Sequence, residues 1–450
     1  MNLKTIHNVY FIGIGGVGMS ALAKYFVADG KAVGGYDKVA TLITDSLVKL
    51  GVGIQFETML SQIDKCFLNS KTTLIVFTPA ISESNPILQY FRTHNFQVLK
   101  RSKVLGLVTE HTQCLAVAGT HGKTTTSSIL GHLLYECNEN LTAFVGGISE
   151  NYQSNLIQKG TDISVVEADE FDRSFLTLSP DFACITSMDA DHLDIYNSEA
   201  ELVETFKAFT KKIKPSGKLF IRKGLPLKGI TYGVNEEADY AALNLRVEKG
   251  AYQFDLQTPT DLIENIIFHL PGTHNVANAV AAMAMALEFG CAKDVLKSAL
   301  ESYKGVKRRF TYQIKTEEFV FIDDYAHHPI EINAVHQAVR EMYPTKKIAV
   351  VFQPHLFSRT KDFADAFADS LSQFDAVFLL EIYPARELPI SGVTSSWLLG
   401  KINSPTKKLI SKSEIVSEIK NLEYPVFMTL GAGDIGLEVS ELKEKLRYAY

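Results

Sequence analysis

The stretch that most constrains this chain runs from Leu115 to Thr126, where an apolar run meets a turn bounded by Gly119 and Gly122. Gly-Lys-Thr-Thr closes the turn, and residues 127–135 continue with a helical pattern. A strand, a glycine-rich turn and a helix in this order surround a polyphosphate with backbone N–H groups and a helix N-terminus. Lys123 then brings positive charge to the outer phosphates, and the Thr124 hydroxyl is suited to Mg²⁺.

This predicted phosphate loop is shorter than the general pattern, because Val117 stands where that pattern has its first glycine. The alternative is an ordinary strand–turn–helix with an exposed lysine. The phosphate loop is favoured because Gly-Lys-Thr-Thr directly follows a strand of the buried type.

A second glycine-rich turn lies near the start of the chain, at residues 13–18. The pattern predicts a strand at 9–14, a helix at 19–28 and a strand at 32–36 that ends at Asp37. A G-x-G-x-x-G turn with an acidic residue about 20 positions later is typical of a dinucleotide fold. With further strands at 73–77 and 98–99, we expect a doubly wound parallel sheet that binds a diphosphate at the helix end.

Length and charge bound the class of protein. A chain of 450 residues exceeds one hydrophobic core, so several domains are expected. The formal net charge of −6 argues against a nucleic-acid partner. No apolar run is long enough to span a bilayer. The five cysteines are scattered without paired spacing, which favours a reducing compartment and no zinc site. We expect a cytoplasmic protein.

The remaining chain again alternates strands and helices. A composition change at 103–106 and the basic run at 307–309 predict three α/β segments at 1–105, 106–307 and 308–450. In the second segment, strands are expected at 164–167, 183–186 and 218–221. Residues 231–268 have the alternation of antiparallel strands, and 275–289 that of a buried helix. The third segment has predicted strands at 319–322, 347–352, 376–380 and 426–430.

Carboxylates gather at two predicted strand ends, where open α/β sheets bind their ligands. Glu167 to Asp172 holds four carboxylates in six residues, which beside a phosphate loop suits Mg²⁺; the alternative is a solvated acidic loop. His192 lies among Asp189, Asp191 and Asp194, an arrangement that suits a metal-bound histidine with carboxylate neighbours. Alone, such a histidine would more often be structural.

Three further groups of polar residues are candidates for a ligand-binding role. Asn275 and Asn278 open the alanine-rich helix, and their amides suit an adenine edge, although one of them fits a helix cap equally well. Arg309 follows Arg308 at the second boundary, where an arginine from another domain can stabilise a transferring phosphoryl group. Asp324 opens the run to Pro329 that contains His327.

Together these segments resemble the Mur ligase family of peptidoglycan synthesis. The resemblance covers all three segments and rests on 13–20, 119–124, 167–170, 190–192, 274–275 and 324–329. The shortened phosphate loop is normal in that family. The resemblance implies a Rossmann-like domain for a UDP-sugar, a central ATPase domain with a mixed sheet, and a Rossmann-like C-terminal domain that binds the amino acid. It implies ATP and Mg²⁺ as cofactors, UDP-N-acetylmuramate and L-alanine as substrates, and a monomer or weak homodimer.

The resemblance also implies residue roles. Lys123, His192 and Arg309 would be catalytic, and Thr124, Glu167 and His192 would hold Mg²⁺. ATP would be bound by Gly119, Thr120, His121, Gly122, Lys123, Thr124, Thr125, Asn275, Asn278, Arg309 and Asp324. The substrates would be bound by Gly15, Gly16, Gly18, His327, Arg359 and Arg386.

Two departures from the family bear on these roles. Many relatives have an arginine at the position of Leu356, so carboxylate binding is expected to depend on Arg359 alone or to use Arg386. Sister ligases carry a carbamylated lysine; Lys207 stands at a comparable distance from His192, but its surroundings do not align, and we expect a surface lysine.

Three alternatives stay open. One is a sister ligase that adds a peptide to the same sugar. Another is a nicotinamide-dependent oxidoreductase built on the first glycine turn and Asp37, which leaves Lys123, Glu167 and His192 unexplained. The last is a nucleotide switch or motor that uses the phosphate loop alone.

Overall fold

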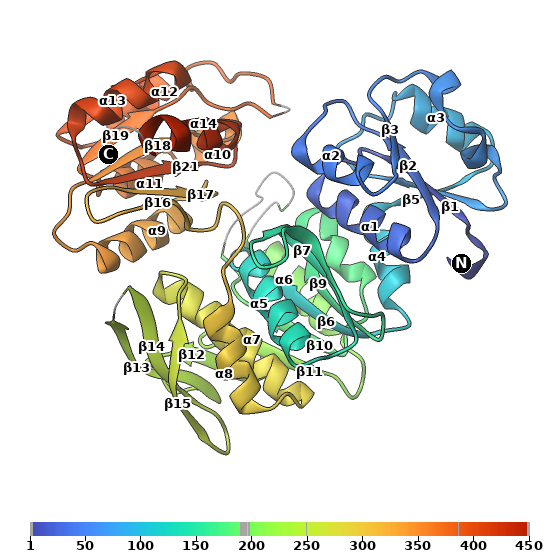
Figure 1. Ribbon diagram of the computed structural model, residues 1–450, viewed down its shortest axis with the longest axis horizontal. Helices are drawn as coiled ribbons and strands as arrows, with labels where there is room; N and C mark the ends of the chain where they lie inside the picture. The colour runs from blue at the N-terminus through green and yellow to red at the C-terminus, as the bar shows by residue number, and fades with distance from the viewer. Residues whose placement is uncertain (1–2, 190–195, 197–198, 249, 386, 448–450) are drawn as a thin grey trace. The chain divides into compact units, whose positions relative to one another are not determined.

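The computed structural model describes residues 3–189, 196, 199–248, 250–385 and 387–447. Its strands form three sheets, which confirms the predicted α/β class with three sheet-centred parts (Figure 1). By contacts the chain divides into a first unit of Met1–Asn244, Phe254–Ile266 and Ala277–Lys304, and a second unit of Leu245–Gln253, Ile267–Val276 and Gly305–Tyr450. The predicted boundaries after residues 105 and 307 stay predictions.

The first sheet is parallel and has the strand order β3-β2-β1-β4-β5, as expected for a doubly wound fold. Its strands are β1 (Asn8–Ile12), β2 (Ala32–Tyr36), β3 (Gly53–Gln55), β4 (Thr73–Phe77) and β5 (Gln97–Lys100). The accompanying helices are α1 (Val17–Ala28), α2 (Leu42–Val48), α3 (Pro86–Thr93) and α4 (Arg101–Thr109). Helix α1 begins two residues earlier than predicted, directly after Gly16, which leaves a tighter turn between β1 and α1.

The second sheet has the order β15-β14-β13-β12-β11-β10-β6-β9-β7-β8. Its strands are β6 (Gln113–Ala118), β7 (Leu141–Ser149), β8 (Ser154–Gln158), β9 (Ile163–Ala168), β10 (Phe182–Ile185), β11 (Lys218–Arg222), β12 (Ile230–Val234), β13 (Tyr240–Glu248), β14 (Ala251–Gln257) and β15 (Leu262–Phe268). Its helices are α5 (Lys123–Glu136), the 3₁₀ segment η4 (Phe171–Thr177), α6 (Glu199–Thr210), α7 (Thr273–Phe289) and α8 (Lys293–Ser302).

One detail of this sheet differs from the prediction. Strands β12 and β13 pair in parallel through a short ladder, so the antiparallel prediction is wrong for this pair. The Asp239 carboxylate accepts hydrogen bonds from the backbone N–H and the hydroxyl of Thr231, at 2.7 and 2.6 Å, beside that ladder. These contacts tie the start of β13 to β12, an arrangement that alternation of polar and apolar residues does not reveal.

The third sheet has the order β16-β17-β21-β18-β19-β20 and is parallel except for the β16–β17 pair. Its strands are β16 (Thr311–Lys315), β17 (Val320–Asp324), β18 (Ile348–Phe352), β19 (Ala376–Leu379), β20 (Thr406–Leu409) and β21 (Val426–Leu430). Its helices are α9 (Pro329–Met342), α10 (Phe357–Asp362), α11 (Ala364–Leu371), α12 (Ser395–Lys401), α13 (Ile415–Leu422) and α14 (Ile435–Arg447). Across the part of the chain described, none of the helices is long and apolar enough to cross a membrane.

One buried apolar cluster of the first unit spans the first and second sheets. Phe11 and Phe26 of the first sheet and its helix belong to the same buried cluster as Ala116 and Phe206 of the second sheet and its helix. Hydrogen bonds from one buried polar side chain also connect helix α1 to the second sheet. Asn155 on β8 is fully buried; its amide donates to Val17 O at 2.7 Å and to the Ser20 hydroxyl at 2.8 Å, and it accepts from Lys24 Nζ at 2.8 Å. Three hydrogen bonds from one side chain thus fix the start of α1 against the second sheet.

Candidate active site

The predicted phosphate loop connects β6 to α5. Gly119 and Gly122 have φ values of +130° and +83°, a region that suits glycine, and a Cβ on Gly119 would lie 2.1 Å from the Thr186 hydroxyl. Helix α5 begins at Lys123. The backbone N–H groups of residues 123–125 have no acceptor among the residues described. They form the positive end of a helix dipole, which is a ready anion site.

Lys123 is buried in an ion pair. Its Nζ donates to both carboxylate oxygens of Glu170 at 2.8 Å and to Gly119 O at 2.7 Å. The Glu170 side chain is fully buried and that of Lys123 is 15% exposed. Burial by itself would lower the pKa of Lys123, but Glu170 together with Asp169 and Glu167 raises it above its usual value. The lysine is therefore held charged beside the helix N-terminus, where an anionic group would be recognised.

Sheet order explains why these residues meet. Strand β6 lies between β10 and β9, all three in parallel, so their carboxyl ends share one edge. The end of β9 supplies Glu167, and the residues after β10 supply Ser187, whose hydroxyl accepts from the His121 backbone N–H at 2.8 Å. The predicted meeting of the acidic strand end with the phosphate loop is confirmed by the Lys123–Glu170 contact.

A set of hard oxygen donors lies beside the loop. The half-buried Glu167 carboxylate accepts from Gly146 N at 2.7 Å and from the Ser127 hydroxyl at 3.3 Å, and the Thr124 hydroxyl also contacts it. Burial raises the pKa of Glu167, so the site gains from a compensating cation. Carboxylate and hydroxyl oxygens fit Mg²⁺. The described residues contain no cluster of three histidine, cysteine or acidic ligands.

Two predicted site residues, His192 and Arg386, lie outside the described residues, as does Asp191. The proposed ligand set of Thr124, Glu167 and His192 therefore stays a prediction. Lys207 lies on α6 in an exposed pair with Glu204 at 2.8 Å, which confirms it as a surface lysine.

The two predicted adenine-binding asparagines belong to different units. Asn278 adjoins the phosphate loop, because a Cβ on Gly122 would lie 2.6 Å from its Oδ1. Asn275 donates from its amide to Pro271 O at 2.6 Å, so part of its hydrogen-bonding capacity is used at the start of α7. Helix α7 begins at Thr273, so this hydrogen bond is not the helix cap that was the structural alternative, and adenine binding by the two asparagines stays a prediction.

The first glycine turn is stabilised from within. Gly15 N donates to the Asp37 carboxylate at 2.7 Å, so this acidic residue fastens the turn. A Cβ on Gly18 would lie 2.9 Å from an Arg101 guanidinium nitrogen, which places that cation beside the first turn of α1. A helix start without a capping side chain and a nearby arginine suit a diphosphate.

In the second unit, Asp324 ends β17 and is buried. Its carboxylate accepts from the backbone N–H groups of Phe310 and Ala326, at 2.6 and 2.7 Å. Burial raises the pKa of Asp324 to about 6, against the opposing effect of Arg309. The Arg309 guanidinium lies over the Tyr325 ring, 5.3 Å from its centre. Asp324 thus holds the turn that presents Arg309.

A histidine cluster follows on the same sheet. His327 Nδ1 lies 3.2 Å from Glu331 and 3.0 Å from Tyr325 O, and its ring centre is 6.0 Å from that of His355. Burial lowers the pKa of both histidines, that of His355 to about 4, with Arg359 acting in the same direction. The lowered pKa values favour the neutral imidazoles, which can donate or accept hydrogen bonds but are weak bases.

Sequence reasoning missed Asn155 and His355. His355 follows the end of β18 by three residues, and the strand-end rule would have found it. No local signal marks Asn155, because its partners are more than 130 positions away.

Three sequence models match the chain: one described as Mur ligase family, catalytic domain, at residues 8–113, the Mur ligase middle domain at 117–286, and the Mur ligase, glutamate ligase domain at 308–434. The chain therefore belongs to the Mur ligase family, a family of ATP-dependent ligases.

Individual relatives show which ligase of this family the chain is similar to. It is 56% identical to UDP-N-acetylmuramate–L-alanine ligase of Flavobacterium psychrophilum, over 99% of both chains, and 55% identical to that of Flavobacterium johnsoniae, over the same shares. The solved UDP-N-acetylmuramate-alanine ligase of Thermotoga maritima matches with a TM-score of 0.83 and 28% identity, over 98% of this chain and 100% of its own. A murein peptide ligase of Psychrobacter arcticus, 20% identical, shares the fold with a TM-score of 0.69.

Proposed function

We propose that this chain joins L-alanine to the lactyl carboxylate of UDP-N-acetylmuramate, with ATP converted to ADP and phosphate, in the synthesis of peptidoglycan precursors. The observation that carries the proposal is the near-complete, 56% identical match to an L-alanine ligase. The charged Lys123 at the start of α5 supports the ATP-dependent chemistry.

The first chemical problem is that a carboxylate is a poor acyl donor. Transfer of the γ-phosphoryl group to the lactyl carboxylate gives an acyl phosphate, but two anions must approach each other. Lys123 and the N–H groups of residues 123–125 stabilise the phosphoryl charge, with Gly119 to Gly122 shaping the loop around it. Thr124 and Glu167, with His192, are proposed to hold Mg²⁺, which offsets further negative charge when bound.

The second step needs an uncharged amine. The L-alanine amine attacks the acyl phosphate, and phosphate leaves from a tetrahedral intermediate. Arg359 is proposed to bind the amino-acid carboxylate, with Arg386 as its alternative. Burial lowers the pKa of His327 and of His355, so both imidazoles favour the neutral form, and they are proposed to hydrogen-bond the incoming substrates. The proton that the ammonium group releases passes to solvent.

The remaining roles are proposed on the same basis. Gly15, Gly16 and Gly18 bind the uridine diphosphate beside Arg101. Asn275, Asn278, Arg309 and Asp324 serve ATP, together with Thr120, His121 and Thr125. We also propose that the protein is cytoplasmic and that it is a monomer or a weak homodimer.

Two alternatives are separated by one experiment. Purified protein is given UDP-N-acetylmuramate, ATP and Mg²⁺ with L-alanine, glycine, L-serine or a tripeptide, and product and phosphate are measured. We expect preferential use of L-alanine and little phosphate release until both co-substrates are present. Preference for the tripeptide would assign the sister activity, and rapid phosphate release from ATP alone would assign a nucleotide switch.

An oxidoreductase is disfavoured by a specific contact. Asp37, which would bind a ribose in a dinucleotide fold, accepts from Gly15 N within the turn. Titration with NADH tests this: saturable binding at micromolar concentration would support the oxidoreductase.

A further inference from the structure

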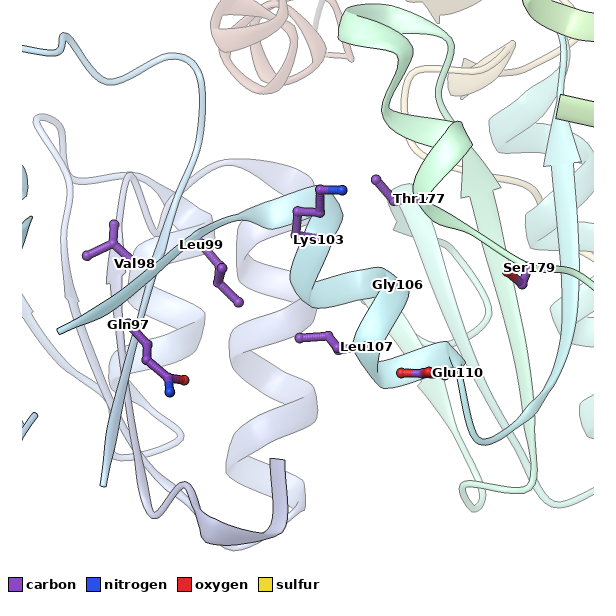
Figure 2. A pocket seen from close by; sticks show the side chains of 9 residues that line it. All are labelled: Gln97, Val98, Leu99, Lys103, Gly106, Leu107, Glu110, Thr177 and Ser179. Atoms are coloured by element: carbon purple, nitrogen blue, oxygen red, sulfur yellow. The ribbon is translucent and has the colours of Figure 1, made fainter. Parts of the chain in front are cut away.

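A hollow of about 660 Å³ lies in the first unit, and no residue of the phosphate loop lines it (Figure 2). We name it the β5 edge pocket. It is lined by Gln97, Val98, Leu99, Lys103, Gly106, Leu107, Glu110, Thr177 and Ser179. Its volume falls within the range of small-ligand sites, which is roughly 300–1,000 Å³. None of these residues has a role in the proposed reaction.

One wall of the pocket is the edge of a sheet. Strand β5 ends the order β3-β2-β1-β4-β5 and, among the described residues, pairs with β4 alone. Consecutive side chains of a strand point to opposite faces. Val98 and Leu99 accordingly pack against different core clusters, yet both line the pocket together with Gln97. The pocket therefore runs along the unpaired backbone edge of β5, where an extended chain can add a strand.

The opposite wall carries one charge of each sign. Lys103 lies on α4 and Glu110 is its C-cap residue, with helical backbone angles. Seven positions separate them, so they share a face and lie about 10 Å apart along the helix axis. Both are exposed, and neither has an ion pair or side-chain hydrogen bond within the described part of the chain. Between them, Leu107 is half-buried, and Gly106 allows close packing on Thr177, whose carbonyl oxygen would lie 2.8 Å from an added Cβ.

The positions of the Lys103 and Glu110 charges relative to β5 indicate which charged ends a bound peptide would have and in which direction it would run. Lys103 lies in the first turn of α4, directly after the carboxyl end of β5, and Glu110 lies at the other end of the helix. An extended peptide parallel to β5 would bring its carboxylate to Lys103 and its ammonium group to Glu110; the antiparallel direction would oppose like charges. A separation of about 10 Å corresponds to about three residues of strand.

We propose that the β5 edge pocket binds a short extended peptide of about three residues, with free amino and carboxyl ends, as an added strand parallel to β5. Its central side chain faces Leu99 and Leu107 and is therefore apolar. The proposal does not depend on the ligase activity.

The probe is the tripeptide Ala-Leu-Ala, titrated into the full chain with methyl-labelled leucines and followed by NMR. We expect saturable shifts at Leu99 and Leu107 and none at Leu50, which is exposed on the same sheet-centred part. The matched variants are Lys103→Gln and Glu110→Gln, with Lys49→Gln as a control at an exposed lysine elsewhere. Each pocket variant should weaken binding by about three- to fivefold, the effect of an exposed ion pair.

Peptides blocked at one end test the direction. C-terminal amidation should weaken binding to the natural chain and abolish the effect of Lys103→Gln; N-terminal acetylation should do the same for Glu110→Gln. If amidation is coupled to Glu110 instead, the parallel direction is wrong. If millimolar peptide produces no saturable shift at Leu99 and Leu107, or if the doubly blocked peptide binds as well as the free one, the proposal is overturned.

Discussion

The buried pair of Lys123 and Glu170 allows a quantitative test of the phosphate site. The substitution Glu170→Gln keeps the shape of the side chain and removes its charge. Lys123 would retain its bond to Gly119 O at 2.7 Å but lose the anion that opposes the effect of burial on its pKa.

The expected cost follows from the burial of the pair. Removing one partner of a buried ion pair leaves the other charge uncompensated, which typically destabilises a protein by about 3–5 kcal/mol. Because the new side-chain amide would still accept one hydrogen bond from Lys123, we expect a loss of about 3 kcal/mol in the nucleotide-free protein. In the variant, the ATP phosphates become the anion that Lys123 contacts, and they no longer compete with the Glu170 carboxylate. The affinity of the protein for ATP should therefore rise by up to about a hundredfold.

Urea unfolding combined with hydrogen exchange of α5 measures the stability of the first unit, with and without ATP. The variant should be less stable than the natural chain without nucleotide and should gain more stability from ATP. Glu204→Gln is the matched control: its pair with Lys207 also spans 2.8 Å but is exposed, so the change should have little effect on stability. Equal stability of Glu170→Gln and Glu204→Gln, or an equal gain from ATP, would refute the reasoning.

Three further predictions follow from other contacts. Asn155→Ala removes three hydrogen bonds made by a buried side chain and should lower the free energy of unfolding by about 3 kcal/mol in urea titration. Ser154→Ala, at a partly exposed residue whose hydroxyl lies 3.4 Å from Lys24 Nζ, should cost less than about 1 kcal/mol. Burial lowers the pKa of His132 from 6.5, so its contribution to stability is complete above that pH and is lost as pH falls through the lowered folded value. His132→Gln should flatten this pH dependence of the free energy of unfolding, measured by unfolding at a series of pH values. An unchanged slope of that free energy against pH would contradict the prediction. Lys123→Ala should reduce kcat about a thousandfold in a phosphate-release assay, and near-normal turnover would contradict the assigned role.

The sequence by itself determined the local chemistry. The order strand, glycine turn and helix around Lys123 was predictable because positive φ values, a helix start and the Lys-Thr pair all lie within a dozen consecutive residues. Strand existence was also predictable, since buried parallel strands are continuous apolar runs, and Val426–Leu430 was predicted to the residue.

Only the tertiary structure decided which distant groups became partners. Glu170 pairs with Lys123 because β9 adjoins β6 in the sheet, and that strand order is not written in either segment. Asp37 and Asp324 were both predicted to face a ligand. In the structure, each carboxylate accepts hydrogen bonds from backbone N–H groups that would otherwise be unpaired in its turn. A residue's type fixes what it can bind, but burial and hydrogen-bond competition fix what it does bind, and these depend on neighbours that chain topology alone brings together.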